Sequence, residues 1–255
     1  MRPMSIRALR FGSVAAAYER FRPGYPDELV DHVLDYTHGP IDTALEIGAG
    51  TGKATRAFAQ RGIAVTATEP DAQMLTELRQ QVPESVTPVE ATFEDLDVQG
   101  PFDLIFAAAA LHWTAQAGRW SKIAQLLRAS GTVANVGGPM KITDPELRDR
   151  IDSVRATILP SDDVAPPGAH EPGGGLQWPG SEMAAAADFT DVEEWVLERR
   201  TTMPSSEYVG NLSTVSAYLE LSPADRAEVL EQIFRALPDE VDVTMDLTVH
   251  LARRV

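Results

Sequence analysis

Apolar and polar residues alternate along the first half of the chain in blocks that predict strands and helices in turn. Apolar runs of five or six residues, the length of buried strands, are separated by stretches whose apolar residues recur every three or four positions. Strands that alternate with such helices favour parallel pairing, helices on both faces of the sheet, and a ligand site at the carboxyl ends of the strands. The predicted strands are 43–47, 64–69, 86–91, 102–107 and 131–136, and the predicted helices are 53–61, 72–81 and 117–127.

The segments on either side of this region predict further elements. Residues 27–36 have an apolar stripe along one helix face, and 223–237 begin with a proline after a capping serine, so both predict helices. A further helix is predicted over 207–219 and a strand over 192–200. Residues 241–251 alternate strictly between apolar side chains and Asp, Thr or His, which predicts one long strand with a single buried face.

Composition and charge exclude several classes of function. The chain has 255 residues, of which 44% are hydrophobic, so it can form a full core, and it contains no cysteine for disulfides or a thiol nucleophile. Its formal net charge is −16, with no large Lys/Arg cluster, which opposes binding to nucleic acids or anionic membranes. Without a signal peptide or a membrane-spanning run, the expected location is cytoplasmic; the oligomeric state stays open.

Candidate chemistry begins at residues 44–55, where a predicted strand ends in a glycine-rich turn that leads into a helix. Glycine there permits positive φ and lets a ligand lie against the backbone, because it has no Cβ. The next predicted strand ends in Glu69, 21 positions after Gly48. In nucleotide-binding α/β folds, an acid about 20 residues after the first glycine accepts hydrogen bonds from ribose hydroxyls. The pair therefore predicts a nucleoside-containing cofactor.

Two cofactor classes compete for this turn. A nicotinamide dehydrogenase would have Gly-x-Gly-x-x-Gly, but the third glycine would fall at Lys53. The pattern is instead Gly-x-Gly-x-Gly beginning at Gly48, with Glu46 two residues before it. It resembles motif I of class I S-adenosyl-L-methionine-dependent methyltransferases, and Glu69-Pro70-Asp71 resembles their ribose-binding second motif.

The resemblance extends over nearly the whole chain. It is to the bacterial methyltransferase type 11 group, near the enzymes similar to trans-aconitate methyltransferase, and it includes residues 11–15, 22–26, 92–96, 102–113 and 212–216. It implies an α/β fold with a Rossmann-like seven-stranded class I methyltransferase sheet, helices on both faces and a helical or loop substrate cap. It also implies S-adenosyl-L-methionine as cofactor, a small-molecule substrate, no metal, and bacterial secondary metabolism as the setting.

The resemblance divides one domain into four parts. Residues 1–40 would be an N-terminal cap segment and 41–138 the S-adenosylmethionine-binding core. Residues 139–190 would be an insertion or cap that includes a flexible Pro/Gly loop, and 191–255 would complete the same domain.

The resemblance also assigns residues to the cofactor. Near its methionine and ribose parts it places Glu46, Gly48, Ala49, Gly50, Thr51 and, on the ribose hydroxyls, Glu69. Near adenine it places Pro70, Met74, Thr92 and Phe93. Many relatives have an acid at the Thr92 position, where threonine accepts one hydrogen bond without charge. At the cofactor's carboxylate and tail it places Tyr18, Arg22 and Tyr25. Ala107 on the fourth predicted strand is also expected to contact the cofactor.

His112 follows the fourth predicted strand, where the methyl group is expected to point. Its usual pKa range suits a general base, although a histidine packed beside Trp113 is an equal alternative. Trp113 is expected to form a wall of the substrate pocket, and the resemblance adds Tyr208 to that pocket. The remaining histidines lack metal-ligand spacing and are expected at the surface or in packing: His32, His38, His170 and His250.

Three functions remain open at this point. The first is methylation of a small molecule on oxygen or nitrogen, for which His112 would remove a proton. The second is methylation of a carboxylate, as in the trans-aconitate enzymes, which needs no base and would use Arg22 or Arg119 for binding. The third is a protein that binds S-adenosylmethionine without turnover.

Overall fold

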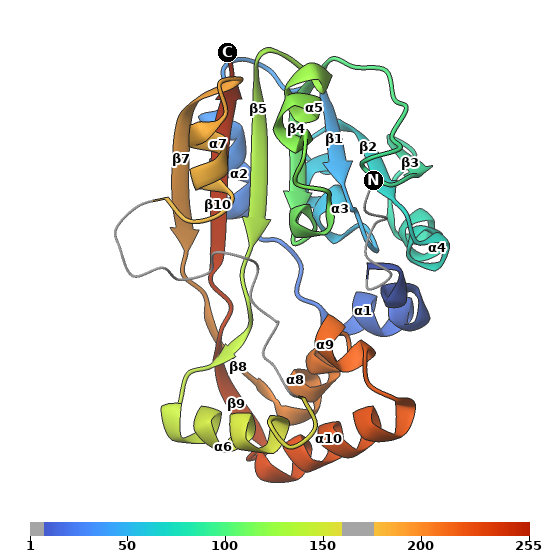
Figure 1. Cartoon of the computed structure of the whole chain (residues 1–255), viewed down its shortest axis with the longest axis vertical. Coiled ribbons are helices and arrows are strands. Elements are labelled where there is room, and N and C mark those ends of the chain that lie inside the picture. Colours follow the sequence, from blue (N-terminus) through green and yellow to red (C-terminus); the bar gives the residue numbers. More distant parts are fainter. Residues whose placement is uncertain (1–7, 160–175) are drawn as a thin grey trace.

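A seven-stranded mixed sheet forms the centre of the molecule (Figure 1). The computed structural model describes residues 8–159 and 176–255, with only the backbone of residues 8 and 9. Five neighbouring strands are parallel, and β10 runs antiparallel to both of its neighbours. Across the sheet the order is β3 (Val86–Glu90), β2 (Ala64–Glu69), β1 (Thr43–Ile47), β4 (Phe102–Ala108), β5 (Leu127–Gly137), β10 (Leu247–Arg254) and β7 (Phe189–Leu197). The predicted fold is confirmed.

Helices cover both faces of this sheet, as the alternation of strands and helices predicts. Val30 of α2 and Phe58 of α3 are buried in the core on one face, and Ile123 of α5 and Met183 of α7 are buried on the other. Helix α4 lies beside β2 and β3 at one edge. These helices are α2 (Asp27–Tyr36), α3 (Lys53–Ala59), α4 (Ala72–Gln81), α5 (Arg119–Leu126) and α7 (Gly180–Ala185).

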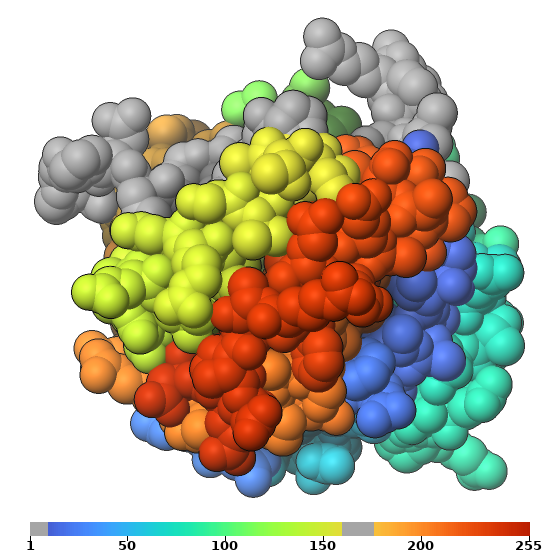
Figure 2. All heavy atoms as spheres, turned by 90° about the horizontal axis from the view of Figure 1, so that it is seen from below, coloured from blue at the N-terminus to red at the C-terminus, as the bar shows by residue number. Residues whose placement is uncertain are grey.

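A separate cap lies beyond the carboxyl ends of the parallel strands (Figure 1). It has a three-stranded antiparallel sheet and its own buried core, which includes Ile233 and Val243. Seen from below, α6 and α10 form its outer surface (Figure 2). The cap strands are β6 (Lys141–Ile142), β9 (Glu240–Thr244) and β8 (Arg200–Pro204), and the helices are α6 (Pro145–Arg155), α8 (Ser205–Leu212), α9 (Ser216–Leu219) and α10 (Pro223–Ala236).

Short connections join the central sheet to the cap. We call residues 138–140, 198–199 and 245–246 the crossover segments, because they link β5 to β6, β7 to β8 and β9 to β10. Next to the cap lie two short N-terminal helices, η1 (Ala8–Val14) and α1 (Ala15–Phe21), and a further 3-10 turn, η2 (Leu111–Trp113), follows β4. No helix in the described part of the chain is long and apolar enough to span a membrane.

The single strand predicted over 241–251 is wrong. Two strands in different sheets occupy it, separated at residues 245–246, and each half keeps the same alternation of buried apolar residues. The predicted strand 192–200 likewise ends at Leu197 before β8 begins, and the predicted helix 207–219 is divided into α8 and α9. The breaks in the strands arise because the two halves pair with strands of different sheets, and the periodicity of apolar residues carries no information about pairing.

The cap combines residues from two of the four predicted parts of the chain. Residues 200–244 form the cap together with β6 and α6, so the final part contributes to the cap as well as to the central sheet. Most of the predicted Pro/Gly loop, residues 160–175, lies outside the described residues.

Candidate functional site

The glycine turn after β1 has the backbone geometry that requires glycine. Gly48, Gly50 and Gly52 have φ values of +68°, +57° and +84°. A Cβ on Gly48 would lie 2.6 Å from the Cβ of Ala110, so a larger residue would displace the loop after β4. The Ala49 amide donates to the carbonyl oxygen of Thr68 at 2.8 Å, which fixes the turn against the end of β2.

Glu69 at the end of β2 faces this turn. Its two carboxylate oxygens accept hydrogen bonds from the amides of Gly50 and Asp71, each at 2.9 Å. Burial raises the pKa of Glu69 to about 7, although both backbone amides oppose the shift. A buried carboxylate held between two strand ends can accept further hydrogen bonds through its remaining lone pairs.

Asp71 fixes the N-terminal segment above the turn. Its carboxylate caps α4 by accepting from the amides of Gln73 and Met74, and it also accepts from the amide of Gly12 at 3.1 Å. A Cβ on Gly12 would lie 2.2 Å from Asp71 Oδ1, so the close approach requires glycine. The contact explains why a residue of the second motif and one near the N-terminus belong to the same site.

Glu46, the last acid before the glycine turn, is 1% exposed. Its carboxyl group accepts a hydrogen bond from the Thr55 hydroxyl of α3. Burial raises the pKa of Glu46 to about 8, and the nearby charge of Glu69 adds to the increase. The turn is therefore flanked by two acids that ionise near neutral pH.

Two cavities meet above the turn. The first, which we call the crossover cavity, extends from the turn to the crossover segments; the second, the aromatic cavity, extends towards Phe11 and Trp113. Both are lined by Tyr18, Gly48, Gly50, Ala108 and Ala109. Of the predicted cofactor residues, the crossover cavity also has Arg22, Tyr25, Glu46, Ala49 and Thr51 on its walls, and the aromatic cavity has Glu69, Pro70, Met74 and Phe93.

Aromatic side chains from three parts of the chain enclose the aromatic cavity. The ring of Phe11 contacts Tyr18 at 6.0 Å and Trp113 at 6.1 Å between centroids, in edge-on geometry for both pairs. Trp113 therefore forms a wall of the aromatic cavity, and its place in a substrate pocket stays a prediction. Since Tyr18 borders both cavities, burial of this side chain, which raises the pKa of its phenol, keeps an uncharged hydroxyl between them.

Four predicted site residues lie outside the two cavities in the described part of the chain. Thr92 exchanges hydrogen bonds with Asp95 and does not reach the aromatic cavity, and Ala107 is buried in the sheet core. Tyr208 is buried in the cap core. The His112 ring lies 4.6 Å from the Trp113 ring, at 46°, which fits the packing alternative. The roles of all four stay predictions.

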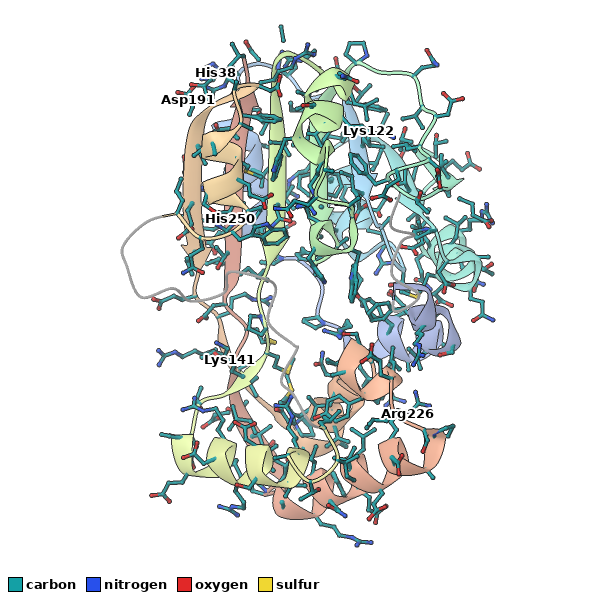
Figure 3. The ribbon with its side chains drawn as sticks, in the orientation of Figure 1. His38, Lys122, Lys141, Asp191, Arg226 and His250 are labelled. Atoms are coloured by element: carbon teal, nitrogen blue, oxygen red, sulfur yellow. The ribbon has the colours of Figure 1, made fainter. Side chains whose placement is uncertain are left out.

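Sequence reasoning did not identify Glu94 and Lys122. Glu94 lines the aromatic cavity, and its carboxylate accepts from the Ala115 amide at 2.6 Å. Lys122 of α5, labelled in Figure 3, donates to the Glu94 carbonyl at 2.9 Å and lies 5.3 Å from the centre of the Phe93 ring. An acid therefore lies on the cavity wall two residues after Thr92, the position at which the resemblance leads one to expect it.

The two arginines proposed for a carboxylate substrate differ in their surroundings. Arg22 lines the crossover cavity while its guanidinium donates to the hydroxyl and carbonyl of Thr214, at 2.8 and 3.0 Å. Arg119 is 5% exposed and pairs with Glu182 at 3.4 Å, and burial lowers its pKa. Arg119 therefore joins α5 to α7, and it also donates to the carbonyl of Thr114, on the wall of the aromatic cavity, at 2.7 Å.

The remaining histidines fit packing or surface roles. His250, labelled in Figure 3, is 3% exposed on β10 and pairs with Glu194 at 2.8 Å, and burial lowers its pKa. His32 stacks on Trp195 with ring centroids 4.0 Å apart. His170 lies outside the described residues. Within the described residues, no group of three or more His, Asp or Glu is arranged to hold a metal ion.

The residues at the turn fit an adenosyl amino acid. Three positive-φ glycines leave backbone accessible to a ligand, and the hydroxyl of Thr51 is buried without a hydrogen-bond partner among the described residues. The nearby acids suit ribose hydroxyls and a positively charged amino group or sulfonium. The aromatic cavity beyond Glu69 offers an apolar site for a purine.

Known proteins similar to this chain include methyltransferases. Residues 45–138 match the methyltransferase domain family. An uncharacterised methyltransferase of Mycobacterium tuberculosis is 37% identical over 130 residues, which are 51% of this chain and 52% of that protein. The chain thus spans about half the length of the curated relatives it matches.

Solved structures extend the similarity to the fold of the whole chain. A protein from Anaeromyxobacter dehalogenans, assigned as a type II methyltransferase, has a TM-score of 0.64 and 24% identity and covers 91% of this chain and 98% of its own. A phosphoethanolamine N-methyltransferase of Haemonchus contortus, solved with S-adenosylhomocysteine, has a TM-score of 0.51 and 14% identity and covers 95% of this chain and 57% of its own.

The seven-stranded sheet is the fold of the class I S-adenosylmethionine-dependent methyltransferases, and the site geometry is consistent with that class. The match to the methyltransferase domain family covers residues 45–138, which hold the glycine turn and Glu69. The turn, Glu69 and the aromatic cavity all fall within this domain or its N-terminal cover.

Proposed function

We propose that the protein transfers a methyl group from S-adenosylmethionine to an oxygen or nitrogen atom of a small molecule, with bacterial secondary metabolism as the setting. The observation that supports this most strongly is the meeting of two cavities over the glycine turn. One cavity has the apolar and acidic lining suited to the nucleoside, and the other leads to the cap. An acceptor entering from the cap side would meet the cofactor above the turn.

The chemistry requires positioning more than covalent help from the protein. The sulfonium supplies the reactive methyl group when the cofactor is bound, and orientation of the acceptor can lower the barrier by up to about 7 to 11 kcal/mol. The turn and Glu69 would hold the nucleoside, while Tyr18 and Tyr25 would exclude water from the space between cofactor and cap. His112 is the proposed base where the acceptor has a proton to lose.

The carboxylate acceptor stays the second candidate, supported by Arg22 on the wall of the crossover cavity. The two candidates predict opposite effects of single substitutions. For a hydroxyl or amine acceptor, His112→Ala would lower kcat by about 10²-fold or more and remove the acidic limb of the pH profile. For a carboxylate acceptor, kcat would be nearly unchanged by this substitution, and Arg22→Gln would raise KM.

Incubation with labelled S-adenosylmethionine and a panel of acids, phenols and amines tests the proposed function. Transfer of label to any member of the panel, abolished by Gly48→Ala, is the expected result. Saturable cofactor binding with no acceptor labelled would favour the third alternative, a protein that binds S-adenosylmethionine without turnover.

A further inference from the structure

The cap contributes its own side of the crossover cavity. Met140, Arg199 and Met245 line it from the three crossover segments, and Asn211 lines it from α8. These residues lie far apart in the sequence and meet only because the strands of the two sheets cross there. Figure 3 shows this region next to Lys141, where β6 begins below the central sheet.

The backbone of Arg199 is fixed by the other crossover segments. Its amide donates to Asp246 Oδ1 at 2.9 Å, and its carbonyl accepts from the Met245 amide at 2.9 Å. Gly138 touches the same segment, since a Cβ there would lie 1.9 Å from the carbonyl oxygen of Asp246. The position from which the Arg199 side chain extends is therefore well defined.

The guanidinium of Arg199 makes no ion pair in the described structure, because the nearby Asp246 carboxylate binds the backbone amide of this residue instead. Within residues 8–159 and 176–255 it makes no hydrogen bond or ion pair, although the residue is half-buried. The other cations on the cavity wall are engaged, Arg22 with Thr214 and Lys53 with Glu19. A partly desolvated charge without a partner costs free energy, and an anionic ligand would remove that cost.

We propose that Arg199 binds a carboxylate group of the methyl acceptor, whose apolar part lies against Met140 and Met245. A guanidinium binds a carboxylate through two parallel hydrogen bonds, and thioether side chains adapt to apolar ligands of varied shape. An ion-paired oxygen is a weaker nucleophile, so this carboxylate anchors the acceptor and a different atom receives the methyl group. The inference rests on the proposed function and names its substrate class.

The cofactor has a carboxylate too, and the geometry separates the two sources. Arg22 extends from the N-terminal segment and lies 5.3 Å from the ring centre of Tyr18, which borders both cavities at the glycine turn. Arg199 extends from the crossover segments that join the cap. We therefore assign the cofactor's carboxylate to Arg22 and the acceptor's carboxylate to Arg199.

Calorimetry with matched acids and amides tests this assignment. The protein saturated with S-adenosylhomocysteine would be titrated with benzoate and benzamide, cinnamate and cinnamamide, hexanoate and hexanamide, and indole-3-acetate and indole-3-acetamide. We expect at least one acid to bind about tenfold or more tightly than its amide, the range of a charge-assisted hydrogen-bonded pair. Arg199→Gln should remove this preference, and Arg199→Lys should keep part of it.

Arg200→Gln is the matched control, because Arg200 is the next residue, carries the same charge and is exposed on β8. It should keep the preference for acids. The inference is overturned if wild-type protein binds no acid in the panel, binds acids and amides equally, or keeps its preference in Arg199→Gln.

The same experiment distinguishes the other failures. Weaker binding of S-adenosylhomocysteine itself to Arg199→Gln would assign Arg199 to the cofactor and contradict the inference. Absence of heat with S-adenosylhomocysteine in wild-type protein would contradict the proposed function instead. The comparison of acids with amides in wild-type protein requires no variant, so a misfolded variant does not prevent a decision.

Discussion

The glycine turn and the crossover segments place different ionisable groups around the two cavities. At the sheet, Glu46 and Glu69 are buried acids held by hydrogen bonds from Thr55 and from backbone amides. At the crossover segments, Arg199 is half-buried, and its guanidinium makes no ion pair among the described residues. The first side suits a cationic cofactor, whereas the second suits an anionic acceptor. This difference supports the proposed arrangement, with the cofactor at the glycine turn and the acceptor at the crossover segments.

The largest effect on affinity for S-adenosylhomocysteine is expected from a substitution in the glycine turn. Gly48→Ala would force a Cβ to 2.6 Å from that of Ala110 at a φ of +68°. We expect calorimetry to detect no binding of S-adenosylhomocysteine, a loss of about 100-fold or more, because the backbone surface for the ligand is displaced.

Gly62→Ala is the control for this substitution. Gly62 has a φ of +83°, but nothing lies within 4 Å of its added Cβ. It should lower stability while the affinity for S-adenosylhomocysteine is retained. Wild-type affinity in Gly48→Ala would show that the turn does not bind the cofactor.

A substitution in the cap core should destabilise the cap without changing the cofactor site. Ile233 of α10 is fully buried there, so Ile233→Ala should lower the free energy of unfolding by about 2 to 5 kcal/mol. Phe234→Ala, at a neighbouring residue that is 50% exposed, should have a much smaller effect in urea denaturation. Affinity for S-adenosylhomocysteine below the unfolding transition should be unchanged; a parallel loss of affinity would mean that the two sides are one binding unit.

A smaller effect is expected from the ribose acid. Glu69→Gln keeps the shape of the side chain but removes its charge and one accepting oxygen, so affinity for S-adenosylhomocysteine should fall by about tenfold. Glu90→Gln is the matched control, because Glu90 is the exposed partner of Glu69 in the β2–β3 register. Equal losses in the two variants would argue against a specific role for Glu69.

The smallest expected effect is the dependence of affinity on pH. Burial raises the pKa of Glu46 to about 8 and of Glu69 to about 7, so both acids lose protons as pH rises through neutrality. The ionised forms favour ribose hydroxyls and a cationic amino group, so affinity should rise severalfold between about pH 6 and pH 8.5.

Stability of the ligand-free protein should change in the opposite direction. Its folded state keeps protons that the unfolded chain has already lost, since both acids have ordinary values of 4.5 when exposed. Thermal unfolding midpoints should therefore fall as pH rises over this window. Glu46→Gln should reduce both trends, and unchanged slopes would contradict the assigned pKa shifts.

The sheet side could be predicted from sequence because its signals are contiguous. The glycine turn and Glu69 each follow an apolar strand directly, and parallel strands bring their carboxyl ends to one edge. Asp71 is a recognisable helix cap in the sequence, and its carboxylate also accepts from the amide of Gly12. These features depend on short-range geometry, which the residue pattern contains.

The cap side could not be predicted in the same way. The alternation from Val241 to Leu251 continues across residues 245–246, so no local signal marks the change from one sheet to the other. Arg199 gains its position from hydrogen bonds to residues almost fifty positions away, and its importance comes from the partner that it lacks within the described structure. Arg119, which the sequence suggested as a binding residue for a carboxylate substrate, is instead buried against Glu182.

Calorimetric titration of the wild-type protein with S-adenosylhomocysteine and, separately, with NADH tests the central claim most directly. The account predicts saturable heat at a single site with S-adenosylhomocysteine and none with NADH, because the turn has Lys53 where a dinucleotide fingerprint has its third glycine. Heat with NADH and none with S-adenosylhomocysteine would contradict it.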